Sequence, residues 1–319
     1  MQGNVHFPTD LNLLWDSLRK CFDLLGKIGT APGFRKSVFW KKKVYDSYRK
    51  TANIHRKKGK NYRARLEAAT EIYLNNTSEV LRRVKNGIVS LRGKVGIMEE
   101  LVLDLVEKYY GWGIKHEDLV RRRILLGEQI PHSEKVFSIF EPHVEWLQKG
   151  KSGNMVELGH NVSVTTDQWG FVVDWEVAEK QSDKQLTVAL GGRLATRFKE
   201  GYRLESISFD RGYYSSPGEK SLKKIFDRVV MPKPGKKTES RCLEESENQF
   251  TKLRRAHSAV ESNINELEQS GADKVRDKGL SGFKKYVGWS VLAHNLKRLG
   301  RMVIESEALP TVKCYKKAA

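Results

Sequence analysis

The sequence predicts an α/β protein in two parts, a helical N-terminal region and a C-terminal region that contains strands. Apolar residues recur at helical spacing up to about residue 130, and short β-branched or alternating runs begin after Pro131. The chain has 319 residues, of which 39% are hydrophobic, enough for one large or two modest domains. Its 58 Lys and Arg against 39 Asp and Glu give a formal charge of +19, which favours a polyanionic partner.

Residues 11–130 are predicted to form a basic all-helical domain, because their apolar residues lie three or four positions apart and Pro and Gly are scarce. One apolar stripe opens the region, and Ile97, Leu101 and Leu105 are predicted to begin another. The first stripe consists of Leu11, Leu14, Leu18, Phe22 and Leu25. Helical segments between the two stripes are indicated by Leu66, Ile72, Leu81, Val84 and Ile88.

Much of the positive charge is concentrated in residues 34–65, which hold 13 Lys and Arg and one acid, Asp46. So dense a block of one sign repels itself unless a polyanion offsets it, and nucleic acid is therefore the predicted partner of these cations. The alternative is a solvated helix face that covers a stripe of core residues. The residues predicted to contact DNA phosphates in this segment are Lys41, Lys42, Lys43, Lys57 and Lys58.

Aromatic residues are interleaved with these cations and suit either stacking against bases or packing in a core. Trp40, Val44 and Tyr48 recur at i, i+4 spacing, so core packing is the favoured interpretation of the aromatic side chains. The aromatic residues of the segment are Phe39, Trp40, Tyr45, Tyr48 and Tyr62.

After Pro131 the pattern predicts strands and helices of an α/β layer. Residues 156–166 and 170–179 are expected to pair as a hairpin, with Gly170 supplying the permissive turn position. Further strands are predicted at 136–140, 204–210 and 228–233, and helices at 183–198, 243–270 and 283–303.

Two carboxylates are candidates for catalysis. Asp210 follows a predicted central strand, and strand ends of open α/β sheets are where catalytic groups collect. Glu261 lies on a helix, on one face with His257 and Asn265. A carboxylate on a strand end and another on a facing helix suit divalent metals in phosphoryl transfer, although each acid alone also fits a cap or a surface charge. The helix's predicted core stripe is Leu253, Ala256, Val260, Ile264 and Leu267.

Basic residues near these acids, and a short basic motif at 149–151, are further candidates for phosphate contacts or plain surface charges. The residues concerned are Lys149, Lys151, Arg211, Lys233, Arg254 and Arg255.

Several function classes lack support in the sequence. No apolar stretch approaches membrane-spanning length and the N-terminus has no signal pattern, so a cytoplasmic protein with no membrane partner is expected. The three cysteines, Cys21, Cys242 and Cys314, are odd in number and widely separated, which favours ordinary thiols over disulfides or a thiolate metal site. The histidines show no paired-ligand spacing. There is no GxxxxGK[ST] motif, so no nucleotide cofactor is indicated.

Three segments resemble a known family: VELGHNVSVTTDQWGFVVDWEV, SFDRGYYS, and the stretch from RRAHSAVESNINELE to GFKKYVGWSVLAHNLKRLGR. Their order and amino-acid sequences are similar to those of DDE-type transposases of bacterial insertion sequences. The segment NVHFPTDLNLLWDSLRK extends the resemblance to the N-terminal end of the sequence. The resemblance implies an RNase H-like catalytic domain at 131–305, a mixed sheet flanked by helices, with the basic helical domain at 11–130 as an insertion and a basic tail at 306–319.

The same resemblance implies Mg²⁺-dependent cleavage and strand transfer on double-stranded DNA, at element ends and at a target. Asp210 matches the second of the family's three metal-binding acids and Glu261 the third. Oligomerisation on DNA is also implied. In relatives the first acid ends a strand just upstream of the segment that contains His6, so residues 1–10 would be a remnant that follows a missing first strand.

A chain without the first acid is expected to have little strand-transfer activity and to keep its DNA binding. Glu141 and Asp174 are the candidates to replace that acid. Glu141 also fits a turn before Pro142, and Asp174 could face solvent through strand alternation. The rival hypotheses are a non-catalytic DNA-binding regulator of transposition and a basic RNA-binding protein.

Overall fold

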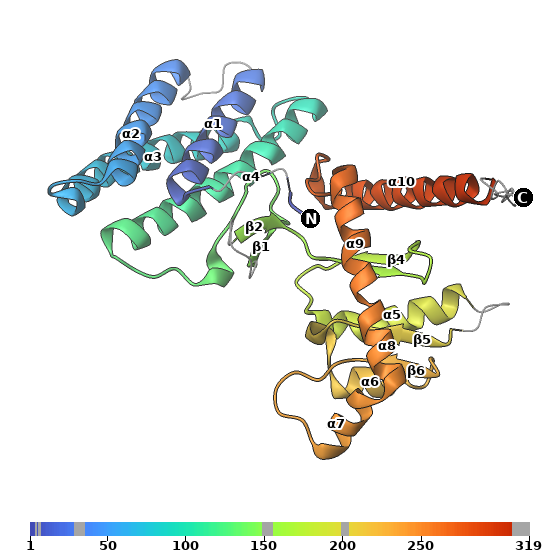
Figure 1. Ribbon diagram of the computed structural model, residues 1–319. Helices are drawn as coiled ribbons and strands as arrows, with labels where there is room; N and C mark the ends of the chain where they lie inside the picture. The colour runs from blue at the N-terminus through green and yellow to red at the C-terminus, as the bar shows by residue number, and fades with distance from the viewer. Residues whose placement is uncertain (4, 6–7, 29–35, 149–155, 199–203, 308–319) are drawn as a thin grey trace, which may run out of the picture. The chain divides into compact units, whose positions relative to one another are not determined.

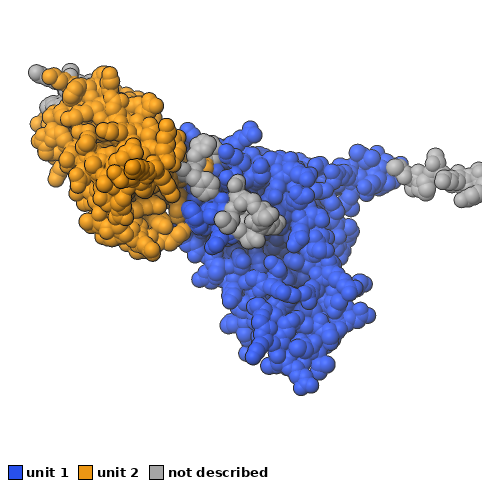
Figure 2. All heavy atoms as spheres, turned by 60° about the vertical axis from the view of Figure 1, so that its left-hand side comes forward, with its two compact units in different colours: residues 1–4, 143–319 blue, residues 5–142 orange. Residues whose placement is uncertain are grey.

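The computed structural model describes residues 1–3, 5, 8–28, 36–148, 156–198 and 204–307 (Figure 1). The chain is mostly helical with small sheets, which agrees with a mixed α/β class. It forms two compact units, coloured separately in Figure 2: a helical unit, Val5–Pro142, and a strand-containing unit, Met1–Asn4 with His143–Ala319.

The division between the units falls at His143 rather than at the expected residue 131. Residues 136–140 are not a strand, because they form bends that pack against the helical unit. Ile139 is fully buried, and the Phe140 ring lies 6.3 Å from the ring of Tyr109. The predicted strand was therefore wrong: the apolar run VFSIF serves helix packing.

Four long helices form the helical unit, as predicted for residues 11–130. The first apolar stripe is buried throughout, and Trp40 and Tyr48 pack against the core as expected. The helices are α1 (Asp10–Ile28), α2 (Ser37–Lys57), α3 (Tyr62–Leu91) and α4 (Ile97–Val120), followed by the π-helical turn η1 (Arg121–Leu125) and the 3₁₀ turn η2 (His132–Glu134).

The stripe predicted on α4 was wrong. Ile97, Leu101 and Leu105 are exposed, and so is Ile72 on α3, whereas Leu103 and Val106 are fully buried. The first half of α4 has apolar residues on several faces, so spacing alone does not say which face points to the core.

The strand-containing unit holds three separate two-stranded sheets in its described part, where the sequence predicted one mixed sheet. Two pairs are antiparallel and the last is parallel. The pairs are β1 (Glu145–Gln148) with β2 (Val156–Gly159), β3 (Val162–Thr166) with β4 (Val172–Val177), and β5 (Ser206–Ser208) with β6 (Arg228–Val230).

The predicted hairpin is confirmed for β3 and β4. The Asp167 carboxylate accepts the N–H groups of Trp169 and Phe171, each at 2.9 Å, and Gly170 has φ 82°. Residues 156–166 nevertheless do not form one strand, because the chain breaks at His160 and its two halves join different sheets.

Helices cover these small sheets and form two separate apolar cores, one under α10 and one between α5, α6 and the β5–β6 pair. The predicted helix at 243–270 is broken into three short helices and a π-helical turn. The helices are α5 (Asp183–Arg197), α6 (Ser216–Leu222), α7 (Glu239–Ser246), α8 (Asn248–Ala256), α9 (Ser258–Leu267) and α10 (Gly279–Glu307), with the turns η3 (Arg211–Tyr213) and η4 (Glu268–Ala272).

The first residues of the chain are hydrogen-bonded into the strand-containing unit. The Gln2 N–H donates to the Asp273 carbonyl at 2.8 Å, and the Gly3 N–H donates to the Leu158 carbonyl at 2.7 Å. Residues 308–319, most of the expected basic tail, lie outside the described residues, and so do His6 and Cys314.

Candidate functional site

Asp210 stands where the β5–β6 pair ends. The Phe209 N–H donates to the Val230 carbonyl at 2.9 Å, so the ladder continues one residue beyond β5, and the buried Phe209 ring anchors that point. The chain then turns into η3, and the Asp210 carboxylate caps the turn by accepting the Arg211 N–H at 2.7 Å. Asp210 and Arg211 are both exposed. Asp210 thus serves as a cap while its carboxylate remains accessible.

Glu261 reaches the same neighbourhood from the helical side. His257 lies at the joint between α8 and α9, half-buried, with Nδ1 3.1 Å from the Ser208 Oγ. Burial lowers the pKa of His257, while the negative charges of Asp210 and Glu261 oppose that shift. Two acids far apart in the sequence therefore act on one imidazole.

The helix that carries Glu261 differs from its predicted stripe. Ala256 and Ile264 are exposed and Asn263 is buried, whereas Leu267 is buried as predicted. The helix is interrupted at His257, between α8 and α9, so one continuous stripe does not describe both. Glu261 is exposed, as expected for a residue that flanks the packed face.

A third acid at this turn escaped the sequence analysis. A side chain at Gly212 would meet the Asp183 Oδ2 at 3.2 Å, which sets the first residue of α5 beside η3. Burial raises the pKa of Tyr213, and the charges of Asp183 and Asp210 raise it further. Ser182 and Gln185 form a capping box beside Asp183. This local pattern predicts the start of a helix but does not predict which distant residues lie close to Asp183.

The structure does not assemble a complete metal site in its described part. No three His, Cys, Asp or Glu side chains there are grouped closely enough to hold a metal ion. Asp210 and Glu261 do offer exposed carboxylate oxygens, the donors that Mg²⁺ prefers. Mg²⁺ is commonly bound through one or two carboxylates together with substrate phosphates, so the donor chemistry of these two acids suits Mg²⁺.

The two candidate replacements for the first acid have surroundings of their own. Glu141 belongs to the helical unit, where its N–H donates to the Ser138 Oγ at 2.9 Å. The solvent-facing alternative for Asp174 was wrong, because this residue on β4 is only 2% exposed. Arg193 and Arg197 of α5 pair with its carboxylate at 2.8 and 3.2 Å. Asp174 is thus a charge-compensated core residue.

The basic segment presents most of its cations to solvent from α2 and the following turn. Lys42, Lys57 and Lys58 are exposed. Lys41 pairs with Asp23 at 2.6 Å, and Lys43 lies over the Trp40 ring at 5.0 Å from its centroid. Exposed interactions of this kind contribute little to stability, so a DNA phosphate can replace the present partner of either lysine.

The remaining residues predicted to contact DNA lie outside α2. Arg254 is exposed on α8, in the same unit as Asp210. Lys149 and Lys151 lie outside the described residues. Among the aromatic residues of the basic segment, Phe39 is 56% exposed and Tyr45 38%, so both can be reached from solvent.

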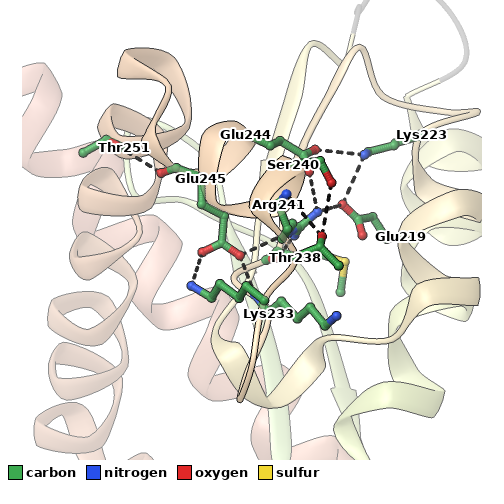
Figure 3. Close-up of polar contacts among 11 residues, drawn as sticks. Glu219, Lys223, Lys233, Thr238, Ser240, Arg241, Glu244, Glu245 and Thr251 are labelled. Carbon is green, nitrogen blue, oxygen red and sulfur yellow. Dashed lines mark hydrogen bonds and ion pairs between the residues drawn. The ribbon is translucent and has the colours of Figure 1, made fainter.

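A buried ion network holds the elements around the β5–β6 pair (Figure 3). The Arg241 guanidinium binds Glu219 of α6 at 2.7 Å and Glu245 of its own helix at 3.1 Å, and it donates to the Met231 carbonyl after β6. Glu245 also accepts the Lys233 N–H at 2.9 Å. The chain from β6 to α7 is thereby fixed, which supports the scaffold on which Asp210 stands.

Comparisons with protein-family models, with curated proteins and with solved structures find no match. Among the described residues, none of the helices combines the length and apolar character that crossing a bilayer requires.

Proposed function

We propose that this chain acts on DNA in the cytoplasm, as a protein of the DDE transposase type with an RNase H-like catalytic domain. The observation that carries the proposal is the contact between the Ser208 Oγ and the His257 Nδ1 at 3.1 Å, because Asp210 follows Ser208 by two residues and Glu261 follows His257 by one helical turn. The sequence resemblance had selected the same two acids. Nothing in their spacing along the chain requires them to be near one another, so their proximity supports a common site.

In this proposal Asp210 and Glu261 hold Mg²⁺ through their carboxylate oxygens. The metal, when bound, supplies Lewis-acid activation of a phosphodiester and of its attacking hydroxyl. His257 is positioned by its contact with Ser208, and the exposed Arg211 and Arg254 offer positive charge to the phosphate backbone. The exposed lysines of α2 add a sequence-independent attraction to DNA and a second copy would complete an oligomer on it.

A second candidate is a DNA-binding regulator of transposition without catalysis. The observation that favours it is the two-acid site: no third metal ligand joins Asp210 and Glu261 in the described residues. Both candidates share the basic α2 surface, and they differ only in whether metal binding leads to cleavage.

The test measures metal binding, nicking and DNA affinity on the same proteins. Fe²⁺ bound in place of Mg²⁺ reduces added hydrogen peroxide to hydroxyl radicals that cut the polypeptide nearby, and ascorbate regenerates the Fe²⁺, so we expect cuts near Asp210 and Glu261. Asp210→Asn and Glu261→Gln should each reduce these cuts, and any Mg²⁺- or Mn²⁺-dependent nicking of supercoiled DNA, by about 100-fold. DNA affinity at fixed salt should change less than about threefold.

Matched controls remove exposed carboxylates elsewhere in the same unit. Asp277→Asn and Glu268→Gln should behave as the wild type in all three measurements. Cuts that persist in both site variants would refute the metal assignment. Metal-specific cuts with salt-sensitive DNA binding but no nicking would select the non-catalytic candidate, and preference for structured RNA over duplex DNA at matched salt would refute the DNA assignment.

A further inference from the structure

The long helix α10 is attached to its unit through one face only. Phe283, Val287 and Val291 are buried on that face. The Asn295 side-chain amide makes two hydrogen bonds to the backbone of Val172 on β4. Its oxygen accepts the Val172 N–H at 2.8 Å, and its nitrogen donates to the Val172 carbonyl at 2.9 Å. Together with the contacts between α10 and β4, these bonds fix the helix along the hairpin (Figure 1).

The opposite face of α10 carries a continuous line of exposed apolar side chains. They are between 44% and 68% exposed, and their spacing alternates between three and four residues. At about 1.5 Å per residue the line is roughly 21 Å long. Scattered exposed apolar residues are ordinary, but a regular line on one helix face marks an interaction surface. The residues are Trp289, Leu292, Leu296, Leu299 and Val303.

Alternating three- and four-residue spacing is the a/d pattern by which one helix packs against another. A seam of two heptads is too short to hold an isolated peptide helical in water. Helix α10 spans 29 residues and is already held by its inner face, so pairing along the seam does not have to order it. The surface therefore fits a second helix.

Charges at the two ends of the seam identify the partner. Lys285 and Glu307 continue the same line, one before Trp289 and the other after Val303, and both are exposed with no ion pair to any described residue. Parallel pairing of two α10 helices would place each of these charges opposite the same charge of the other copy, which is repulsive. Antiparallel pairing centred on Leu296 instead sets Lys285 opposite Glu307 at both ends.

We propose that two copies of this chain associate through an antiparallel pair of α10 helices with Leu296 on the twofold axis. In this register Trp289 lies opposite Val303 of the other copy and Leu296 opposite its own copy, while Leu292 and Leu299 lie opposite the small residues Gly300 and Ala293. The residues beside the seam, such as Ala293 and Gly300, are small and uncharged, so the helices can approach closely. Such an interface is self-complementary, as twofold symmetry requires.

Sedimentation equilibrium of the full chain, freed of nucleic acid, tests the proposal. Nucleic acid must be removed because it would bridge copies of so basic a protein. The expected result is a reversible monomer–dimer equilibrium. Leu296→Glu sets two carboxylates against each other on the axis and should raise the dissociation constant by about 100-fold. Ile304→Glu, the matched control on the same helix but off the seam, should change it less than about threefold.

A charge exchange tests the orientation. Lys285→Glu and Glu307→Lys should each raise the dissociation constant about 3- to 10-fold, and the double variant should return close to the wild-type value. A monomer at every concentration up to about 100 μM would overturn the proposal. Equal effects of Leu296→Glu and Ile304→Glu would also overturn it, and failure of the double variant to recover would overturn the antiparallel pairing.

Discussion

The two units stabilise their helices in different ways. In the helical unit, all four long helices contribute to one apolar core that runs from Leu11 to Val120. The strand-containing unit has two smaller cores, and buried ion pairs join its elements. Arg241 links α7 to α6 through Glu219, and Asp174 links β4 to α5 through Arg193. Small two-stranded sheets bury little apolar area, so charge networks supply connections that a large core would otherwise make.

The largest effect is therefore expected in the strand-containing unit, from Arg241→Met. The substitution keeps side-chain bulk but leaves Glu219 and Glu245 buried without their shared cation. Breaking a buried network in this way costs about 3 to 5 kcal/mol, and the remaining partners Lys223 and Lys237 favour the lower end. Urea denaturation followed by far-UV circular dichroism measures the loss in the free energy of unfolding.

Arg228→Met serves as the control for Arg241→Met, because Arg228 is exposed on β6 in the same unit. It should change the free energy of unfolding by less than about 0.5 kcal/mol. Similar losses for the two variants, or a loss in the helical unit's transition alone, would contradict the contrast between the units.

The helical unit contains a buried histidine that has no hydrogen-bond partner among the described residues, in contrast to the paired buried charges of the other unit. His116 is fully buried on α4, and neither ring nitrogen has a hydrogen bond to any described residue. Burial lowers the pKa of His116 to about 4, with Lys115 acting in the same direction and Asp10 against it. The unfolded chain then binds a proton before the folded chain does.

The stability of the helical unit should therefore be fully present above pH 6.5 and fall as the pH drops toward 4. Between pH 6.5 and 5 the expected loss is about 2 kcal/mol, before most carboxylates titrate. His116→Leu should remove this loss and leave only the slope due to His55, whose pKa burial also lowers. His132→Gln is the exposed control. A slope unchanged by His116→Leu would show that another group is responsible.

The sequence was informative wherever a pattern was local. Leu14 and Leu18 were predicted as core because α1 has a single apolar stripe, and the turn at Gly170 was predicted from neighbouring residues alone. On α4 the same reasoning failed at Leu101, because apolar residues occupy several faces there. The pairing of short strands depends on contacts between distant segments, so spacing could not show that residues 156–166 divide between two sheets.

Asp210 was a candidate from its place after a predicted strand and Glu261 from its helix face, and the motif resemblance then assigned both to one site. Asp183 was missed because its proximity to Gly212 depends on how α5 packs. Asp174 shows the converse limit. Strand alternation left its direction open, and only the packing of Arg193 over β4 explains why a carboxylate is buried there.

The smallest effect is expected at the hairpin turn, where local and long-range constraints can be separated. Gly170→Ala strains a backbone at φ 82° and brings a methyl group within 2.8 Å of the Arg298 guanidinium, which donates to the Trp169 carbonyl at 2.6 Å. Gly235→Ala strains a similar φ of 74° with no atom within 4 Å. We expect losses of about 2 and about 1 kcal/mol in the free energy of unfolding, respectively. The difference measures how firmly α10 is held against the hairpin, since equal losses would mean that Arg298 moves aside freely.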